Sequence, residues 1–324
     1  MTGQIIQFHD LHPTQADFER EVLTGLRARP RRIPPKFFYD QRGSELFEAI
    51  TETPEYYPTR SEIEILRRRA DEIAKAVGTG ILLVEPGGGS CAKVRILLGG
   101  LEPVAYVPMD ISRDHLHAAA QELAAEFPWL EVHAAHADFT QQMELPPGAP
   151  EGPRVAFFPG SSIGNFDPEA AVGFIAAVAE LVGPGGFLLI GVDLRKDKAV
   201  LDAAYDDAGG ATAAFNLNLL ERMNRELDAD FDLDAWAHRA GYNEAVGRVE
   251  MHLLSLRDQQ VTVAGEVFDF CAGETIHTEN SYKYGIDEFQ DLARRAGMDS
   301  AGVWTDRRGL FSVHLLRNMA AGGA

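Results

Sequence analysis

The stretch GILLVEPGGGSCAK, residues 80–93, decides the fold of this chain. Its apolar first half has the length and composition of a buried strand, and the three glycines that follow allow a sharp turn and the close approach of a ligand to the backbone. The helix expected from Ala92 then presents its N-terminal end to a phosphate or carboxylate. A strand, a glycine loop and a helix in this order open the nucleotide-binding α/β folds. Gly87, Gly89 and Ala92 also satisfy the dinucleotide fingerprint, so the loop alone does not separate NAD from another adenosine-containing cofactor.

Strands and helices alternate on both sides of this loop. The other expected core strands share short, continuous apolar runs, and they lie at residues 103–110, 130–138, 154–160, 186–193 and 310–316. The expected core helices share a 3.6-residue apolar period, and they cover 62–77, 286–298 and the stretches that begin at Arg113 and Pro168. This alternation predicts a parallel sheet covered on both faces. We therefore expect an α/β fold with a doubly wound, Rossmann-like core at residues 62–193 and 286–318.

The remaining residues, 1–61 and 194–285, break this alternation. Helices are predicted at 15–29 and, singly or as a pair, over 197–226, and an antiparallel hairpin pair is predicted over 251–270; the segment PPKFFYD, 34–40, is expected to be a rigid linker whose prolines prevent a helix. We expect these parts of the chain to form a second α+β lobe that binds the substrate.

The composition argues against several functional classes. A formal net charge of −19 over 324 residues repels nucleic-acid phosphates and anionic lipids. The N-terminus has no basic segment leading into an apolar run, and no apolar stretch approaches the ~18 residues of a membrane span, so we expect a cytoplasmic protein. The two cysteines, Cys91 and Cys271, have no paired spacing and are expected to be reduced thiols. The ten histidines show no metal-ligand pattern, so no metal is expected.

Acidic residues follow the next two strands at positions that suit an adenosine. Asp110 closes the run 103–110, where a carboxylate can accept hydrogen bonds from both ribose hydroxyls. Asp138 and Phe139 follow the next run and would place an acceptor for the adenine amino group beside a ring that covers the base. Lys93 is expected in the first turn of the helix, where a lysine calls for an anionic partner such as a cofactor carboxylate. In the alternative interpretation each aspartate caps the following helix and Lys93 is a solvated surface residue.

The fourth strand ends in FPGSSIGNF, residues 158–166. Ligands of open α/β sheets bind at the carboxyl ends of the strands, so this loop of small residues is expected to border the reacting group. Asn165 offers both a donor and an acceptor there.

Four long motifs occur in a fixed order along the chain. They are FYDQRGSELFEAITETPEYYPTRSE (38–62), FFPGSSIGNF (157–166), AYDDAGGATAAFNLNLLERMNREL (204–227) and IHTENSYKY (276–284). With them the chain resembles the histidine-specific Nα-methyltransferases of ergothioneine biosynthesis, from about residue 15 to residue 317. The resemblance implies a class I methyltransferase core that binds S-adenosyl-L-methionine. It also implies that the α-amino group of L-histidine is trimethylated to hercynine.

The resemblance further implies roles for individual residues. Tyr39 and the carbonyl of Gly160 are the expected catalytic contacts, since they would hold the amine. The residues expected to bind the rest of the amino acid are Asn165 and Tyr205 at the α-carboxylate, Tyr56, Glu279 and Ser281 at the imidazole, and Met251 at the wall of the side-chain pocket. The residues expected to bind the cofactor are Gly87, Lys93, Asp110, Asp138 and Phe139.

The chemistry of these side chains favours histidine over tryptophan as the substrate. A carboxylate at Glu279 accepts an imidazole N–H and Ser281 serves the other ring nitrogen, whereas an indole offers one donor and no acceptor. A buried acid that faces the carbon edge of an indole is left unpaired, at a cost of about 1–3 kcal/mol.

Departures from the family pattern leave alternatives open. Pro86 and Gly88 stand in the glycine loop where Leu and Ser are expected, and Asn280 and Tyr282 lie in a stretch that varies, which widens the range of substrates to consider. The alternatives are an Nα-methyltransferase of another amino acid such as tryptophan, an NAD-linked enzyme, and a non-catalytic sensor of S-adenosylmethionine or of an amino acid.

Overall fold

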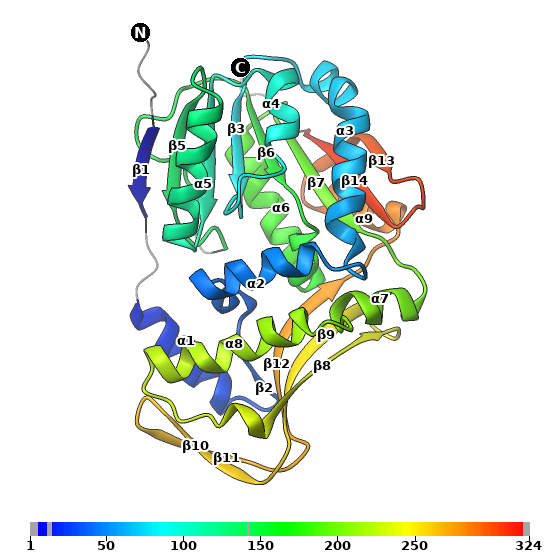
Figure 1. Cartoon of the computed structure of the whole chain (residues 1–324). Coiled ribbons are helices and arrows are strands. Elements are labelled where there is room, and N and C mark those ends of the chain that lie inside the picture. The colour runs from blue at the N-terminus through cyan, green and yellow to red at the C-terminus, as the bar shows by residue number, and fades with distance from the viewer. Residues whose placement is uncertain (1–5, 12–14, 141–142, 320–324) are drawn as a thin grey trace. The chain divides into compact units, whose positions relative to one another are not determined.

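The computed structural model describes residues 6–11, 15–140 and 143–319, and these residues divide into two compact units (Figure 1). The sheet unit comprises the described residues of 1–13, 58–195 and 283–324, and the second unit comprises those of 14–57 and 196–282. Both units are therefore built from segments that lie far apart in the sequence.

An eight-stranded sheet forms the centre of the sheet unit, in the order β1-β5-β4-β3-β6-β7-β14-β13. Its strands are β1 (Ile6–Asp10), β3 (Leu82–Pro86), β4 (Ala105–Asp110), β5 (Glu131–His136), β6 (Arg154–Phe158), β7 (Phe187–Asp193), β13 (Met298–Thr305) and β14 (Phe311–Asn318). The first six strands in that order are parallel, and β14 is antiparallel to both of its neighbours. The strand order reverses at β3, which pairs with β4 and β6. Doubly wound folds bind their ligands at this switch point, outside the carboxyl ends of the strands.

Helices cover both faces of this sheet, as Figure 1 shows. They are α3 (Tyr57–Val77), α4 (Arg95–Leu101), α5 (Arg113–Glu126), α6 (Pro168–Val182) and α9 (Ile286–Arg295), with the 3-10 turn η2 (Ser162–Asn165) after β6. Successive side chains of β3 point to opposite faces. Leu83 packs in a core that includes residues of α3, α4 and α5, whereas Leu82 and Val84 pack in a smaller core with Leu181 of α6. Burial on both faces explains why these strands are continuous apolar runs, and the prediction of an α/β fold with a doubly wound core is confirmed. The sheet is parallel as predicted except at β14, whose antiparallel pairing the sequence does not predict.

The second unit combines a four-stranded sheet in the order β2-β12-β9-β8 with a separate β10–β11 hairpin. Its strands are β2 (Arg31–Arg32), β8 (Trp236–Asn243), β9 (Arg248–Ser255), β10 (Gln259–Val263), β11 (Glu266–Phe270) and β12 (Thr275–Tyr282). Its helical segments are α1 (Gln15–Arg27), η1 (Pro35–Phe38), α2 (Gln41–Thr51), α7 (Lys198–Tyr205), α8 (Ala211–Glu226) and η3 (Leu233–Ala235). α7 and α8 pack on β8 and β9, and α2 packs on α8. Burial alternates along β9, as expected for a sheet with one covered face.

The structure differs from the sequence predictions at several places within residues 1–61. Ile6–Asp10 form β1 and pair with β5, so they belong to the sheet unit and not to the lobe in which the sequence places residues 1–61. The linker 34–40 contains one turn of 3-10 helix, because a proline at the first helical position forfeits no hydrogen bond. α2 follows where no helix is predicted.

The remaining differences concern strands with polar residues. β8, β12 and β13 are absent from the sequence prediction because their apolar residues do not form a continuous run. The predicted hairpin pair divides: β10 and β11 form a hairpin, whereas β9 lies between β8 and β12.

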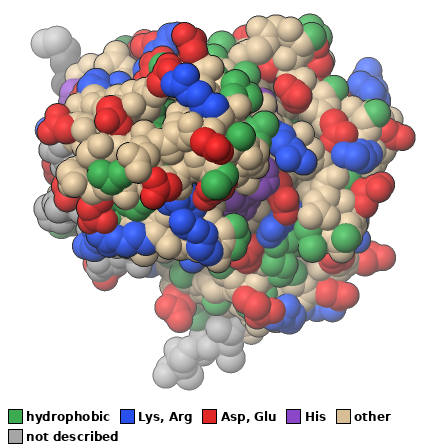
Figure 2. Space-filling view, turned by 90° about the horizontal axis from the view of Figure 1, so that it is seen from below, with side chains coloured by type: hydrophobic (Ala, Val, Ile, Leu, Met, Phe, Trp, Pro, Cys, Tyr) green, Lys and Arg blue, Asp and Glu red, His purple; other side chains and the backbone are tan. Residues whose placement is uncertain are grey.

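Two further observations concern membrane-spanning helices and the distribution of charged side chains on the surface. Among the described residues, no helix has the length and the apolar character that crossing a membrane requires. On the face in Figure 2, acidic and basic side chains are interspersed and hydrophobic ones lie singly or in small groups.

Candidate active site

The glycine loop after β3 turns back towards the end of β4. The amides of Gly87 and Gly88 donate to the carbonyl of Met109 at 2.7 and 3.1 Å. Gly87 has a φ of +77°, a conformation that residues with side chains rarely adopt. At Gly89 a Cβ would lie 2.9 Å from Oδ2 of Asp110, so only glycine lets the loop pass beside this carboxylate. The loop and the predicted ribose acceptor are therefore neighbours.

Asp110 has both a structural contact and an oxygen that faces the loop. Its Oδ1 accepts a hydrogen bond from the amide of Ser112 at 2.8 Å, at the residue before α5 begins. Burial raises the pKa of Asp110 above its usual value, while the amides of Ser112 and Gly89 favour the charged form. The capping interpretation therefore accounts for one oxygen, and Oδ2 remains beside the glycine loop.

Asp138 and Phe139 lie at the next strand end. Oδ1 of the buried Asp138 accepts from the amide and the hydroxyl of Thr140 at 3.0 and 2.5 Å, which orders the turn after β5. The Phe139 ring packs edge-on against Phe158, and a Cβ on Gly87 would lie 3.6 Å from it. The structure thus brings Phe139 and Asp110 to the same glycine loop, as the sequence predicts.

Lys93 lies in the turn before α4, which begins at Arg95 and not at Ala92 as expected. Its Nζ is 2.5 Å from Oε2 of Glu62, a fully buried residue of α3. The interpretation of Lys93 as a solvated surface residue is therefore wrong. Its anionic partner in this structure belongs to the protein, and its contact with a cofactor carboxylate stays a prediction.

The loop after β6 contains Gly160 and Asn165. Gly160 has a φ of +84°, and its amide donates to the Glu62 carboxylate, 2.9 Å from Oε2. Ser161 also has a positive φ, of +59°, and its Oγ accepts from the amide of Asp193 at 2.9 Å. The half-buried Asn165 ends the turn η2, and its side chain makes no hydrogen bond to the described residues. Its amide is therefore available for a ligand.

In the second unit, four predicted substrate contacts lie on one face of the sheet. Glu279 of β12 is opposite Met251 of β9, and Ser281 follows two residues later, so the three side chains share a face. The Tyr205 hydroxyl, at the end of α7, is 2.7 Å from Oγ of Ser281. The Tyr205 ring in turn lies edge-on to Tyr56, with centroids 6.3 Å apart.

A bulge in β12 sets this register. The pairing with β9 shifts between His277 and Glu279. The extra residue, Thr278, is buried, and its hydroxyl hydrogen-bonds Oδ1 of Asn216 in α8 at 2.9 Å. Because a one-residue slip moves every following side chain to the other face, this bulge decides which face Glu279 and Ser281 occupy.

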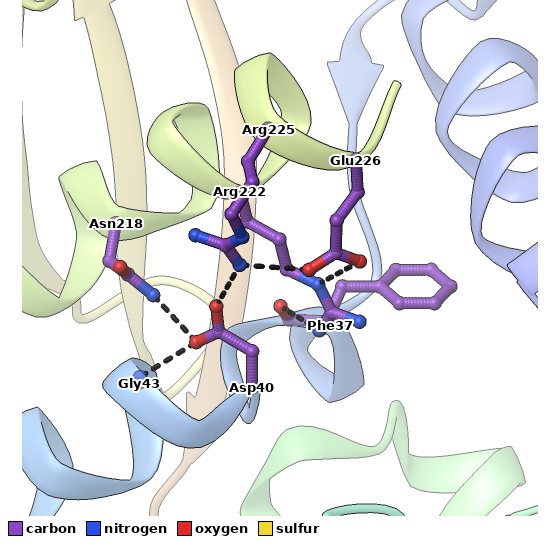
Figure 3. Close-up of polar contacts among 7 residues, drawn as sticks. All are labelled: Phe37, Asp40, Gly43, Asn218, Arg222, Arg225 and Glu226. Carbon is purple, nitrogen blue, oxygen red and sulfur yellow. Dashed lines mark hydrogen bonds and ion pairs between the residues drawn. The ribbon is translucent and has the colours of Figure 1, made fainter. Parts of the chain in front are cut away.

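Phe37 and Asp40, which flank Tyr39 in the sequence, are both held by side chains of α8, as Figure 3 shows. On one side Arg222 donates to the carbonyl of Phe37 at 2.9 Å. On the other side the Asp40 carboxylate accepts from Asn218 and Arg225 at 2.9 and 2.5 Å.

Asp40 also caps α2, since it accepts from the amide of Gly43 at 2.7 Å. The Tyr39 ring packs edge-on against Phe47 of α2 and Phe215 of α8, and Phe47 also contacts Tyr56. Tyr39, Tyr56, Tyr205 and Ser281 thus form a continuous series of contacts through Phe47.

The comparisons with known proteins agree with this arrangement. A family model described as histidine-specific, S-adenosylmethionine-dependent methyltransferase matches residues 18–318. The chain belongs to this family. Among the relatives, Histidine N-alpha-methyltransferase of Mycolicibacterium smegmatis is 43% identical over 91% of this chain and 93% of that protein.

More distant relatives bear other names. Ergothioneine biosynthesis protein 1 of Neurospora crassa is 31% identical over 93% of this chain and 35% of that protein. The 4-dimethylallyltryptophan N-methyltransferase of Claviceps purpurea is 26% identical over 88% of this chain and 90% of that protein.

The groups around the glycine loop of this methyltransferase fit S-adenosylmethionine. Gly87 and Gly89 leave the backbone open to close approach, Asp110 keeps an acceptor oxygen beside the loop, and Phe139 supplies a ring at its edge. These are the contacts that an adenosine with a charged amino-acid tail requires. The individual roles remain predictions.

Two buried acids of the methyltransferase have no role in the sequence analysis. The Glu62 carboxylate accepts hydrogen bonds from both the Lys93 ammonium and the Gly160 amide. Glu85, at the end of β3, accepts from the Tyr106 hydroxyl at 2.5 Å, and burial raises its pKa to about 7. For Glu85 the available signal is a charged residue within an apolar run, LLVEP, whereas Glu62 stands between Ser61 and Ile63 in a helix with other acids, and the sequence gives no signal for it.

Proposed function

We propose that this methyltransferase transfers three methyl groups from S-adenosylmethionine to the α-amino nitrogen of L-histidine and so forms hercynine, a step of ergothioneine biosynthesis. The observation that carries the proposal is the shared face of Glu279, Ser281 and Tyr205. A carboxylate acceptor beside two hydroxyls matches the two ring nitrogens of imidazole, one of which donates while the other accepts. The 43% identity to a histidine N-alpha-methyltransferase over 91% of the chain supports the same substrate.

The residues of the protein have to position a neutral amine, and strong acid–base catalysis is not required. Bound S-adenosylmethionine supplies an electrophilic methyl group on a sulfonium sulfur, which the nitrogen lone pair takes in an in-line displacement. Holding the reacting atoms about 3–3.5 Å apart in line supplies much of the rate enhancement. We assign this task to Tyr39 and the Gly160 carbonyl at the amine, and to Asn165 and Tyr205 at the α-carboxylate.

Successive methylation changes what the amine can bind. Each transfer replaces one N–H donor with a methyl group, so hydrogen bonding gives way to packing against aromatic faces. The final trimethylammonium group is a cation that a tyrosine ring attracts. Tyr39→Phe keeps the ring and removes the hydroxyl, so we expect the first methylation to slow more than the third. Wild-type rates at all three steps in Tyr39→Phe, measured by product masses over time, would remove Tyr39 from the proposed role.

Glu279 is proposed to select histidine. Glu279→Ala removes the acceptor for the imidazole N–H, so histidine KM should rise about 5- to 150-fold, the equivalent of 1–3 kcal/mol, and rejection of tryptophan should relax. Glu250→Gln is the matched control, because Glu250 lies on β9 next to Met251 and on the other face of the sheet, where it pairs with Arg248. Unchanged discrimination between the two amino acids in Glu279→Ala would count against this residue.

The decisive test is mass spectrometry of the purified protein with S-adenosylmethionine and each of the twenty amino acids in separate reactions. Histidine should gain about 42 mass units, the increment of three methyl replacements on one nitrogen. Gain on another amino acid would reassign the pocket. Binding of S-adenosylhomocysteine without any transfer would favour the sensor, and binding of NADH in its place would favour the NAD-linked alternative.

We further propose that the enzyme acts on the free amino acid in the cytoplasm, without nucleic acid or membrane. The net charge of −19 supports this.

A further inference from the structure

Glu62 is the most enclosed acid near the glycine loop. It lies in the second turn of α3, and its side chain has no exposed surface. Its Oε2 is 2.5 Å from Nζ of Lys93 and 2.9 Å from the amide nitrogen of Gly160, which is also 3.1 Å from Oε1. A buried carboxylate is costly unless it is paired and hydrogen-bonded, and these two partners satisfy both requirements.

The central sheet reserves space for this carboxylate. A Cβ at Gly191, in the middle of β7, would lie 2.0 Å from Oε1 of Glu62. Glycine within a strand weakens it and commonly marks a close approach. At Gly191 the approaching group is the Glu62 carboxylate, which occupies the space that a side chain at position 191 would fill.

The two partners of Glu62 belong to loops that follow adjacent parallel strands. Lys93 follows β3 and Gly160 follows β6, and β3 pairs with β6 at the switch point of the sheet. One carboxylate therefore joins the loop that is expected to bind the cofactor to the residue whose carbonyl is expected to hold the amine. The Lys93 ammonium has three donors, so its bond to Glu62 leaves others for a ligand.

We propose that Glu62 is a positioning residue for methyl transfer, which orients Lys93 for the cofactor's carboxylate and holds the Gly160 amide so that the following carbonyl faces the amine. The proposal rests on the proposed function for its second half only. It predicts that affinity for S-adenosylhomocysteine and the rate of methylation fall together when the carboxylate is neutralised, even though Glu62 reaches these groups only through Lys93 and Gly160.

The test compares Glu62→Gln, Lys93→Gln and the double variant with wild type. Calorimetry measures the Kd for S-adenosylhomocysteine, and steady-state kinetics measure kcat and KM for histidine. Glu62→Gln should raise the Kd about 10- to 100-fold, the range of a charge-assisted hydrogen bond, and kcat should fall more than the histidine KM rises. In the Lys93→Gln background the further loss of affinity should be less than about twofold. The kcat should still fall, because the neutral amide oxygen that Glu62→Gln introduces holds the Gly160 amide less strongly than the carboxylate does.

Glu64→Gln is the matched control, since Glu64 lies on the same helix and pairs with Arg68 at the surface. A Kd and kcat of Glu62→Gln within about twofold of wild type, or a lowered thermal midpoint alone, would overturn the proposal. If Glu62→Gln does not fold, the double variant, in which both partners are neutral, is the deciding protein. A Kd of the double variant more than about threefold above that of Lys93→Gln would overturn the proposal. Calorimetry with S-adenosylhomocysteine needs no amino acid. A wild-type protein that fails to methylate histidine would therefore refute the proposed function, while the Kd values would still test whether Glu62 positions Lys93.

Discussion

Glu85 should make the stability of this protein fall with rising pH through the neutral range. It is the penultimate residue of β3, two residues before Gly87, is almost completely buried, and accepts from the Tyr106 hydroxyl. Burial raises its pKa from 4.5 to about 7, against the opposing effect of that hydrogen bond. The carboxyl group is therefore more readily ionised in the unfolded chain than in the folded one. Its contribution is fully present below pH 4.5 and is lost as the pH rises towards and through 7.

The size of the effect follows from the two pKa values. A difference of 2.5 units, 7 minus 4.5, corresponds to about 3.4 kcal/mol once the pH is well above 7. With these two pKa values, about 2 kcal/mol of stability is lost below pH 6, and about 1.3 kcal/mol is lost between pH 6 and pH 8. Glu85→Gln keeps an acceptor oxygen for Tyr106 and cannot ionise, so it should abolish this part of the pH dependence.

The assay is urea unfolding of wild type and Glu85→Gln at pH 6, 7 and 8. The free energy of unfolding of wild type should fall by about 1.3 kcal/mol more than that of the variant, and every other titrating group cancels in the comparison. Glu122→Gln, an exposed acid on α5, should run parallel to wild type. Parallel profiles for wild type and Glu85→Gln within about 0.3 kcal/mol would refute the assignment of a neutral, buried acid to this position.

Three further predictions concern other side chains. Burial lowers the pKa of His314 from 6.5 to about 4, so protonation favours the unfolded chain. Wild type should therefore lose stability between pH 7 and pH 5, and His314→Gln should remove about 2 kcal/mol of this loss in urea unfolding. Ser281→Ala leaves the buried Tyr205 hydroxyl without this partner, so the KM for histidine should rise about tenfold while the Kd for S-adenosylhomocysteine stays constant. An equal rise in KM and Kd would contradict a local role of Ser281. Asp40→Ala removes the cap of α2 and should lower the free energy of unfolding by about 1–2 kcal/mol in thermal denaturation, whereas Arg225→Ala, at an exposed side chain, should cost less than about 1 kcal/mol.

The sequence predicts the core of the fold well because local chemistry specifies it. Strands buried on both faces must be apolar throughout, and each is followed by residues that allow a turn into a helix, so 80–93 and the later strand ends can be located by inspection. Gly87, Asp110 and Phe139 follow from the same rule, since the carboxyl ends of parallel strands meet at one edge of a sheet. β8, β12 and β13 escape prediction because edge and half-exposed strands carry polar residues, which a search for apolar runs misses.

The partners of the site residues were decided by the tertiary structure. Nothing in the neighbourhood of Lys93 indicates Glu62, which lies 31 residues earlier in α3, and nothing near Ser281 indicates Tyr205, which is 76 residues away. The bulge at Thr278 depends on Asn216 of α8.

The sequence by itself therefore determined the fold class, the family and the residue types at the site, because these depend on short-range patterns and on long motifs. Only the tertiary structure decided how the groups are paired, which acids are buried and which face of β12 carries Glu279. Pairing and burial depend on distances between segments remote in sequence, and the energies of ion pairs and pKa shifts vary steeply with those distances.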